Sequence, residues 1–256
     1  MIGQLTETAP GIYVPDVHDD IVVAHSDRRN GNIDPRFVEG DEWTEARQRL
    51  FEQAGLHAGQ VAVIGFAKGR GPSNEFVDLG DAEPPERPVV TDGLVTTRPG
   101  VGLMLNPADC LALALYHSDR QVLMLAHLGW RGIKLGLHTN MLEYAAGEYD
   151  VDTEQAAVYF SPSIGPRSYV APDVDEDQRN DPKWEAFIDE QTDGFHLDFP
   201  GYVKRDLGED FGITQIHDSG IDVGADPHHF SFTRLKDGTQ DVNGRNGFVV
   251  AIRPAV

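Results

Sequence analysis

The chain has 256 residues, of which 40% are hydrophobic and 25% are charged, a composition typical of a globular protein. Its formal net charge of -21 argues against unassisted binding to nucleic acid or to anionic membranes, because a phosphate surface requires a basic partner face. No apolar run is long enough to span a bilayer, and the N-terminus lacks a basic start followed by an apolar stretch. We therefore expect a cytoplasmic protein without a secretion signal and without a membrane or nucleic-acid partner.

Cysteine and lysine are both scarce. The one cysteine, Cys110, excludes an internal disulfide framework, fits a reducing compartment and is a candidate nucleophile or metal ligand. Only five of the 21 basic residues are lysines. An acidic, lysine-poor surface suits solubility in concentrated salt, so we expect the stability of the protein to rise with KCl concentration.

The N-terminal part of the chain predicts several short strands and one clear helix. Strong helix formers, with Trp43, Leu50 and Ala54 near one face, predict a helix over 42–55. Short apolar runs predict strands at 21–25, 60–66, 91–97 and 101–105. The segment 69–88 is rich in glycine, proline and acidic residues, and we expect it to form an exposed loop.

The stretch 106–132 predicts a hairpin that brings two chemically active side chains together. Its two apolar strands are expected at 111–116 and 121–126. With Ser118 and Asp119 at the tip of the turn, Cys110 faces His127, and directly opposed residues have Cβ atoms about 4.5–5.5 Å apart. A one-residue slip would send the two side chains to opposite faces. The pairing suits a thiolate–imidazole pair or half of a metal site.

The C-terminal part of the chain continues the mixture of helices and strands. Helical spacing of apolar residues predicts helices over 133–147, stopped by Gly147, and over 199–209. Strands are expected at 158–161, 213–216, 230–234 and 247–252. The acidic segment 173–181 is expected to be a loop. Because hairpins are present and strict βαβ alternation is absent, we predict an α+β fold: one domain over 1–256, with mixed β-sheets flanked by helices.

Three motifs resemble the laccase-domain family, which is also labelled multicopper polyphenol oxidase. They are Ala-Asp-Cys-Leu at 108–111, Ala-His-Leu-Gly-Trp-Arg-Gly at 126–132 and Ser-Ile-Gly-Pro at 163–166. Weaker matches follow the family in order at 26–28, 91–95, 195–198, 231–234 and 244–245. The family includes purine nucleoside phosphorylase-like enzymes and a bacterial peptidoglycan editing factor. The resemblance implies a single mixed domain, in agreement with the pattern of strands and helices.

The resemblance also implies a metal site, usually assigned as zinc, with one cysteine and two histidines. Cys110 matches the ligand cysteine and His127 the second histidine, whereas Lys68 stands where the family has its first histidine. A protonated lysine cannot ligate a metal, and its charge opposes a bound cation. Two further cysteine-containing pairs of the family are replaced here, by Arg167-Ser168 and by Ile221-Asp222. The alternative third ligands are His25, His217, His228 and His229.

The other candidate site residues each have a functional and a structural interpretation. Lys68 either lies by chance in a loop or places an ammonium beside Cys110, which would lower the thiol pKa and replace the metal. Asp109 either orients His127 or caps local backbone. Arg131 begins a helix, where it can hold a phosphate or close the turn. Arg28 and Arg245 are candidate anion-binding residues or surface ion-pair partners, while Cys110 and His127 could also simply pack in the core.

The leading functional prediction is an enzyme that acts on purine nucleosides of the adenosine or inosine type, by phosphorolysis with phosphate as the acceptor or by deamination. The first alternative is an amidase-like hydrolase of peptidoglycan precursors, with Cys110 as nucleophile and His127 as base. The second alternative is a metal-free binding or regulatory protein that retains the fold. Copper-dependent oxidation is the least favoured, because one cysteine and scattered histidines do not build a multi-copper cluster. The sequence carries no signal for an oligomeric state.

Overall fold

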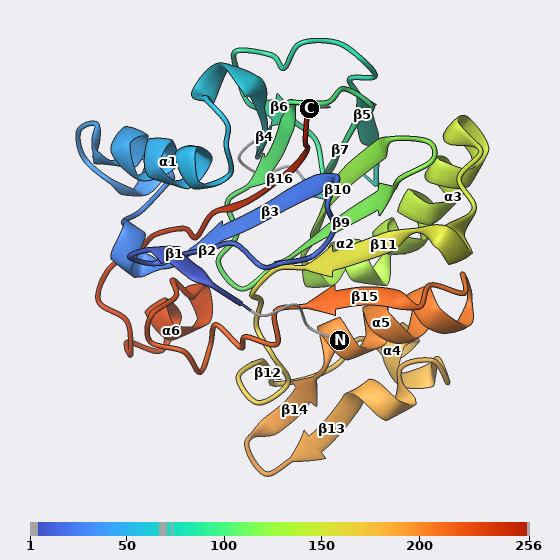
Figure 1. Cartoon of the computed structure of the whole chain (residues 1–256). Helices are drawn as coiled ribbons and strands as arrows, with labels where there is room; N and C mark the ends of the chain where they lie inside the picture. The colour runs from blue at the N-terminus through green and yellow to red at the C-terminus, as the bar shows by residue number, and fades with distance from the viewer. Residues whose placement is uncertain (1–4, 67–70, 73, 255–256) are drawn as a thin grey trace.

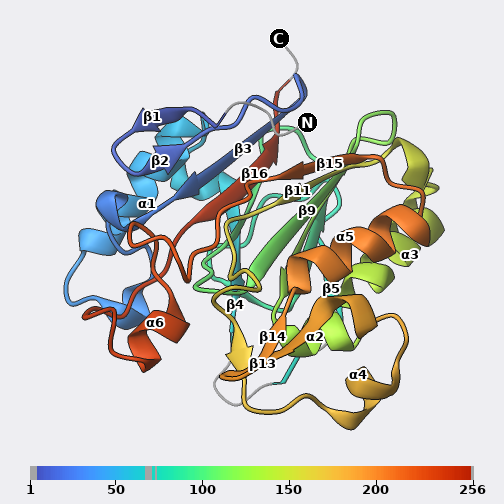
Figure 2. The same ribbon diagram turned by 90° about the horizontal axis from the view of Figure 1, so that it is seen from below.

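Two large β-sheets packed face to face form the centre of the molecule (Figures 1 and 2). The computed structural model describes residues 5–66, 71–72 and 74–254. The seven-stranded sheet has the order β1 (Glu7–Ala9), β2 (Ile12–Tyr13), β3 (Ile21–Ser26), β16 (Phe248–Ile252), β8 (Gly102–Leu105), β4 (Val61–Gly65) and β6 (Val89–Val90). The C-terminal strand β16 is therefore an inner strand, hydrogen-bonded to β3 on one side and to β8 on the other.

The second large sheet carries the hairpin that the sequence singles out. Its order is β15 (Gln215–Asp218), β11 (Ala157–Phe160), β9 (Leu111–His117), β10 (Val122–Leu128), β7 (Gly93–Thr96) and β5 (Phe76–Asp78). A small third sheet has the order β12 (Val170–Ala171), β14 (Gly194–Leu197) and β13 (Ile188–Gln191). Both large sheets contain parallel and antiparallel neighbours.

Alternation along the strands explains how the sheets stack. In β9 the side chains of Leu111, Leu113 and Leu115 join a core on the outer side of the sheet. Ala112 and Ala114, which point the opposite way, pack between the two sheets. Both faces of this sheet are therefore buried, which is why β9 and β10 read as nearly continuous apolar runs.

Helices cover the outer faces of both sheets (Figure 2). Among the described residues the α-helices are α1 (Glu42–Gln53), α2 (Trp130–Lys134), α3 (Leu137–Tyr149), α4 (Glu176–Asn180), α5 (Phe199–Glu209) and α6 (Phe232–Lys236). Leu50 and Phe51 of α1 pack on the seven-stranded sheet, whereas α3 and α5 pack on the six-stranded sheet. The predicted α+β fold with mixed sheets flanked by helices is confirmed.

Two predicted elements are wrong in type or extent. The segment 230–234, predicted as a strand, instead begins α6, because the Ser231 hydroxyl accepts a hydrogen bond from the Arg234 amide at 3.2 Å and caps the helix. The predicted helix over 133–147 is two helices, separated at Gly136, whose φ of 73° lies in the left-handed region. The second of them runs past the predicted stop and ends at Tyr149, and the next residue, Asp150, has a left-handed φ of 53°.

Two segments predicted as loops contain regular structure. The strand β5 lies within 69–88 and pairs in parallel with β7. The short helix α4 lies within 173–181, with acidic residues in its first turn. Both elements are too short to leave a periodic signal in the sequence, and tertiary pairing creates the strand.

The predicted register of the hairpin is wrong by two residues. His127 lies opposite Ala112 rather than opposite Cys110. The observed loop, 118–121, lies one residue later than the predicted turn, 117–120, because Gln121 takes a φ of 49° and its amide donates to the Ser118 carbonyl at 3.1 Å. Since side chains alternate with a period of two, a two-residue shift leaves Cys110 and His127 on the same side of the sheet.

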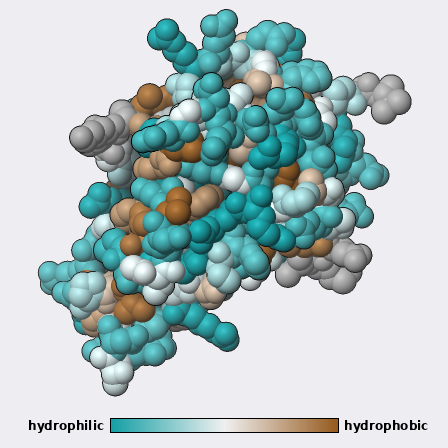
Figure 3. All heavy atoms as spheres, turned by 90° about the vertical axis from the view of Figure 1, so that its left-hand side faces the viewer, coloured by the Kyte–Doolittle hydropathy of each residue, from teal (hydrophilic) through white to brown (hydrophobic). Residues whose placement is uncertain are grey.

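The surface reflects the acidic composition. Figure 3 shows a face on which hydrophilic residues predominate and hydrophobic residues gather in separate patches. None of the helices in the described part of the chain is long and apolar enough to cross a membrane.

Candidate functional site

Cys110 and His127 lie close together at one end of the β9–β10 hairpin, on the face of the six-stranded sheet that packs against the seven-stranded sheet. His127 is in β10, and Cys110 directly precedes β9. A Cβ atom added to Gly129 would lie 3.4 Å from Cys110 Sγ, 3.6 Å from His127 Cε1 and 3.8 Å from His127 Nε2. The thiol and the imidazole therefore share one small space, which the missing side chain of Gly129 leaves open.

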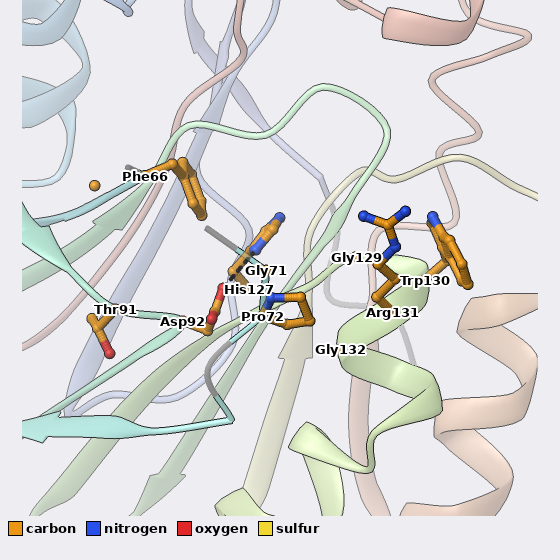
Figure 4. A pocket seen from close by; sticks show the side chains of 11 residues that line it. Phe66, Gly71, Pro72, Thr91, Asp92, His127, Gly129, Trp130, Arg131 and Gly132 are labelled. Carbon is orange, nitrogen blue, oxygen red and sulfur yellow. Dashed lines mark hydrogen bonds and ion pairs between the residues drawn. The ribbon is translucent and has the colours of Figure 1, made fainter. Parts of the chain in front are cut away.

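Asp92 is the third member of this group. The β7–β10 pairing continues past Gly93, so that the His127 amide donates to the Asp92 carbonyl at 2.8 Å. On the same side, Asp92 Oδ1 lies 3.3 Å from His127 Nδ1 (Figure 4). Three neighbouring segments of one sheet thus line up the thiol, the imidazole and the carboxylate.

Negative partners favour the protonated form of His127. Burial lowers the pKa of the imidazole, but the electrostatic interaction with Cys110 and the hydrogen bond that the imidazole donates to Asp92 outweigh it and raise the pKa to about 9. The ring of Phe66 stands edge-on to the imidazole, with 4.6 Å between the ring centres. His127 is therefore held as a proton donor with one apolar neighbour.

A cavity of about 880 Å³, called the Cys110 cavity below, opens beside this group. Its wall combines the thiol and imidazole with aromatic and charged side chains: Arg36, Phe66, Asp109, Trp130, Tyr169, Phe232, Thr233, Lys236, Asp237 and Arg245. Within a chain of net charge -21, three cationic and two acidic side chains make this wall locally basic. The cavity can accept an aromatic ligand that carries an anionic group.

Two arginines form the inner basic part of the Cys110 cavity. Arg36 is fixed by a two-point ion pair, with its Nη2 2.6 Å and its Nε 2.9 Å from the carboxylate oxygens of Asp34. Arg245 donates from Nη1 to Asn243 Oδ1 at 3.0 Å and to the Gly244 carbonyl at 2.6 Å. Burial lowers the pKa of Arg245, and within the described ranges no carboxylate is ion-paired with it.

A second, smaller cavity of about 200 Å³ lies on the other side of His127 and is lined by Thr91, Asp92 and Arg131 (Figure 4). The Arg131 guanidinium carbon lies 4.9 Å from the Trp130 ring centre, and both side chains project from the start of α2. That helix has only five residues. Its dipole is therefore small, and the exposed side chain of Arg131 is the main feature that could attract an anion there.

Asp109 does not orient His127. Its Oδ2 accepts hydrogen bonds from the amide and the hydroxyl of Thr233, at 2.7 and 2.8 Å, and so ties the segment before Cys110 to α6. The backbone of Asp109 has a φ of 82°, a left-handed value that is uncommon outside glycine. Neither predicted role is observed as stated: Asp109 holds the distant backbone of Thr233 and not local backbone, and the carboxylate beside His127 is that of Asp92.

The remaining predicted residues divide into one inside the cavity and others outside it. Arg245 lines the Cys110 cavity. Arg28 instead lies 3.3 Å from Asp241, with its guanidinium over the ring of Phe230, and lines neither cavity. Lys68 lies outside the described residues. The alternative ligands His25, His217, His228 and His229 are absent from both cavity walls.

The donor set does not fit a zinc site. Catalytic zinc is held by three protein ligands, and among the described residues no group of three histidine, cysteine, aspartate or glutamate side chains is placed to hold a metal ion. The residues outside that part of the chain contain none of these four types. Cys110 and His127 supply two metal donors, and the Asp92 carboxylate is hydrogen-bonded to the imidazole instead of serving as a third.

Sequence reasoning missed four residues of the site: Asp92, Arg36, Phe66 and Tyr169. A signal for Asp92 was present in the sequence, because the residue stands in the Thr-Asp-Gly-Leu-Val stretch that resembles the family, directly before a strand. The other three come from segments without a motif, and only the packing of the sheets and the third sheet brings them to the cavity.

Comparison with solved structures shows the fold. The crystal structure of the hypothetical protein YfiH from Bacillus licheniformis matches 97% of this chain and 99% of its own, with a TM-score of 0.83 at 19% identity. The crystal structure of YlmD from Geobacillus stearothermophilus matches 98% of this chain and 99% of its own, with a TM-score of 0.81 at 20% identity.

Sequence comparison finds relatives whose names state an activity. The human purine nucleoside phosphorylase LACC1 is 27% identical over 170 residues, which are 66% of this chain and 36% of the relative, so the chain spans about a third of that protein. Purine nucleoside phosphorylase PA4543 from Pseudomonas aeruginosa is 27% identical over 201 residues, 77% of this chain and 74% of the relative. The family described as multi-copper polyphenol oxidoreductase laccase matches residues 39–253. The chain therefore belongs to this multi-copper polyphenol oxidoreductase laccase family.

Proposed function

We propose that the protein cleaves purine nucleosides with phosphate in the Cys110 cavity. The observation that carries the proposal is that one cavity joins Cys110 and the His127–Asp92 pair beside it to the cationic side chains of Arg36 and Arg245. The names of the relatives support purine nucleosides as the substrate class.

The chemistry assigns a role to each group. A phosphate oxygen bonds to C1′ of the ribose while the bond from C1′ to the base breaks, and the base leaves with a proton. His127 donates that proton, because Cys110 and Asp92 both stabilise the imidazolium. Arg245 holds the phosphate beside the ribose, since its guanidinium lines the cavity and matches an oxyanion.

The assay incubates inosine or adenosine with and without phosphate and measures free base, ribose 1-phosphate and ammonia. We expect base and ribose 1-phosphate to form only with phosphate. His127→Asn is expected to lower kcat about 10²–10⁴-fold. His57→Asn is the matched control, because His57 is exposed and asparagine retains its role as a helix cap. Wild-type protein that releases neither base nor ammonia would overturn the proposal, while ammonia alone would redirect it to deamination.

The phosphate role has its own matched pair of variants. Arg245→Gln is expected to raise the KM for phosphate about tenfold or more, with a smaller effect on the KM for the nucleoside. Arg28→Gln removes an arginine that lies outside both cavities and is expected to leave both KM values unchanged. Equal effects of the two variants would contradict a phosphate role for Arg245.

A second candidate, a thiol amidase acting on cell-wall precursors, is favoured by the order Asp92–His127–Cys110. A carboxylate that orients an imidazole beside a thiol is the arrangement of cysteine hydrolases. The Cys110 sulfur would bond to the amide carbonyl, the amine would leave with a proton from His127, and water would then hydrolyse the thioester. Intact mass measured during turnover of a peptidoglycan-type amide distinguishes the two, because only this mechanism adds an acyl group to the sole cysteine.

Two properties of the same preparation separate the remaining alternatives. Stoichiometric zinc that is lost in Cys110→Ala would return the metal to the mechanism. Absence of zinc together with binding but no turnover of nucleosides would favour a metal-free binding or regulatory protein. A cytoplasmic location stays a prediction, and cell fractionation tests it.

A further inference from the structure

Asp222 forms a hydrogen-bonded brace outside the cavities. Its Oδ1 accepts from the Gly165 and Gly224 amides, both at 2.9 Å, and its Oδ2 accepts from the Ser168 hydroxyl at 2.7 Å. Ser163 and Asp222 also form an isolated parallel β-bridge. One carboxylate therefore fastens the loop 163–169 to the segment around Asp222.

Two glycines make this close packing possible. A Cβ atom on Gly165 would lie 2.9 Å from Asp222 Oδ2, and one on Gly224 would lie 2.3 Å from Ser168 Cβ. Both distances are too short for any side chain. The carboxylate is thus enclosed between two backbones that approach each other closely, which fixes the loop in one position.

The braced loop reaches the Cys110 cavity at two points. The Ile164 amide donates to the Asp109 carbonyl at 2.8 Å, directly before Cys110. At the other end of the loop, the Tyr169 amide donates to the Gly165 carbonyl at 3.0 Å, and its ring lines the cavity. The segment before Cys110 is therefore held from one side by α6, through Thr233, and from the other side by this loop.

From these contacts we infer that Asp222 is a positioning residue for the Cys110 cavity. Through the loop 163–169 it fixes the backbone that carries Cys110 and the wall that Tyr169 forms. Asp222 does not line the Cys110 cavity, so it acts on substrate only through these two residues. The inference rests on the proposed function for its kinetic test, but not for its structural test.

The structural test is hydrogen–deuterium exchange of the full chain, read by mass spectrometry. In Asp222→Ala, amides of 163–170 are expected to exchange about tenfold faster or more, because three hydrogen bonds to a carboxylate are lost. Peptides covering 108–112, which do not contact Asp222, are also expected to exchange faster. Asp222→Asn is expected to stay near wild type, since its oxygen still accepts from both amides and the Ser168 hydroxyl can turn to accept from the new amide. Asp189→Asn, on exposed β13, is the control.

A second readout follows the sole cysteine directly. The rate of iodoacetamide addition to Cys110 is expected to change about threefold or more in Asp222→Ala and to be restored in Asp222→Asn. If Asp222→Ala does not fold, Ser168→Ala removes one bond and is expected to give a smaller change in the same direction. Exchange of 108–112 and Cys110 alkylation that both equal wild type in a folded variant would overturn the inference.

The kinetic test separates this inference from the proposed function. In an active wild type, Asp222→Ala is expected to raise the KM for the nucleoside through Tyr169 and to lower kcat through Cys110, each about tenfold. Changes in stability alone, with KM and kcat unchanged, would reduce Asp222 to a structural residue and overturn the inference. If the wild type has no nucleoside activity, the exchange and alkylation results still decide the matter.

Discussion

Two of the histidine–aspartate pairs in this protein lie on opposite sides of the six-stranded sheet, and they serve different ends. His127 and Asp92 face between the sheets, beside the Cys110 cavity, with 3.3 Å between Nδ1 and Oδ1. His138 of α3 and Asp206 of α5 lie under the helices that cover the outer face, with 2.9 Å between Nε2 and Oδ2. The residue types are the same, so the surroundings must account for the difference.

Exposure and neighbouring charge separate the two pairs. The side chains of His138 and Asp206 are 1% and 5% exposed, and Arg205 and Lys183 add positive charge. Burial opposes ionisation of Asp206, but the hydrogen bond from His138 and these charges hold the pKa of the carboxyl below its usual range. The His127 side chain is 21% exposed, and Cys110 acts together with Asp92 to raise its pKa. One pair joins two helices, and the other keeps a proton at the wall of a cavity.

The largest expected effect is on stability and comes from the helical pair. Asp206→Ala leaves the buried His138 without its ion-pair partner and removes one carboxylate from Arg205, so we expect a loss of about 3–5 kcal/mol in the free energy of unfolding, measured in urea at neutral pH. Asp92→Ala, beside a cavity that water can enter, is expected to cost about 1 kcal/mol. Similar losses in the two variants would contradict the distinction between the pairs.

The next effect is the pH at which each pair stops stabilising the fold. Because the pKa of Asp206 is lowered in the folded state, its contribution is present above the unfolded value of about 3.9 and is lost as pH falls through the folded value. The pKa of His127 is raised, so its contribution is complete below about 6.5 and is lost as pH rises through about 9. NMR titration of the His127 ring checks the alkaline limb, and Cys110→Ala is expected to lower its pKa. An unchanged value in that variant would remove Cys110 as the cause.

Salt is expected to stabilise the whole molecule without distinguishing the pairs. Raising KCl from about 0.1 to about 1 M shortens the screening length from about 10 to about 3 Å, which weakens repulsion among the 42 acidic residues. We expect a gain on the order of 1 kcal/mol in the free energy of unfolding. The difference between wild type and Asp206→Ala is expected to persist, because a buried pair is hardly screened. Stability that is indifferent to KCl would argue against adaptation to salt.

The smallest expected effect concerns the space between the thiol and the imidazole. Gly129→Ala adds a methyl group about 3.4 Å from Cys110 Sγ and is expected to slow iodoacetamide addition to Cys110 about threefold, with little change in stability. Gly147→Ala is the control, since that position in α3 has no atom within 4 Å of an added Cβ. Faster alkylation in Gly129→Ala would contradict the proposed crowding.

Hydrophobic periodicity was sufficient for the long elements of the fold. The helix 199–209 was predicted at its observed limits, and the strands around 111–126 follow from their apolar runs. The helix α6 was missed because its cap, Ser231, precedes a run of β-compatible residues, and the hydrogen bonds of Ser231 to Arg234 and of Asp109 to Thr233 are visible only in the structure. The third sheet was missed because its short strands are stabilised by pairing and not by their own composition.

The central part of the site was predictable because side chains along a strand alternate between its two faces, so a shift by an even number of residues keeps each side chain on the same face. Register placed Cys110 opposite the wrong residue, yet a shift of two residues kept it on the side of His127. For Asp92 the sequence offered only its place in a stretch that resembles the family, and for Arg36 it offered no signal. The approach of Asp92 to His127, and of Arg36 to the cavity, depends on how strands and sheets far apart in the sequence pack, which no local pattern contains.

The position of β16 has a consequence for synthesis of the chain. Residues Phe248–Ile252 occupy an inner place between β3 and β8, so the seven-stranded sheet cannot close until these late residues have left the ribosome. Until then β3 and β8 present unpaired edges and an uncovered apolar face, the features that recruit chaperones or lead to aggregation. Folding of this protein is therefore completed after translation of the strand that joins its two halves, and a nascent chain arrested before Phe248 should remain sensitive to protease throughout that sheet.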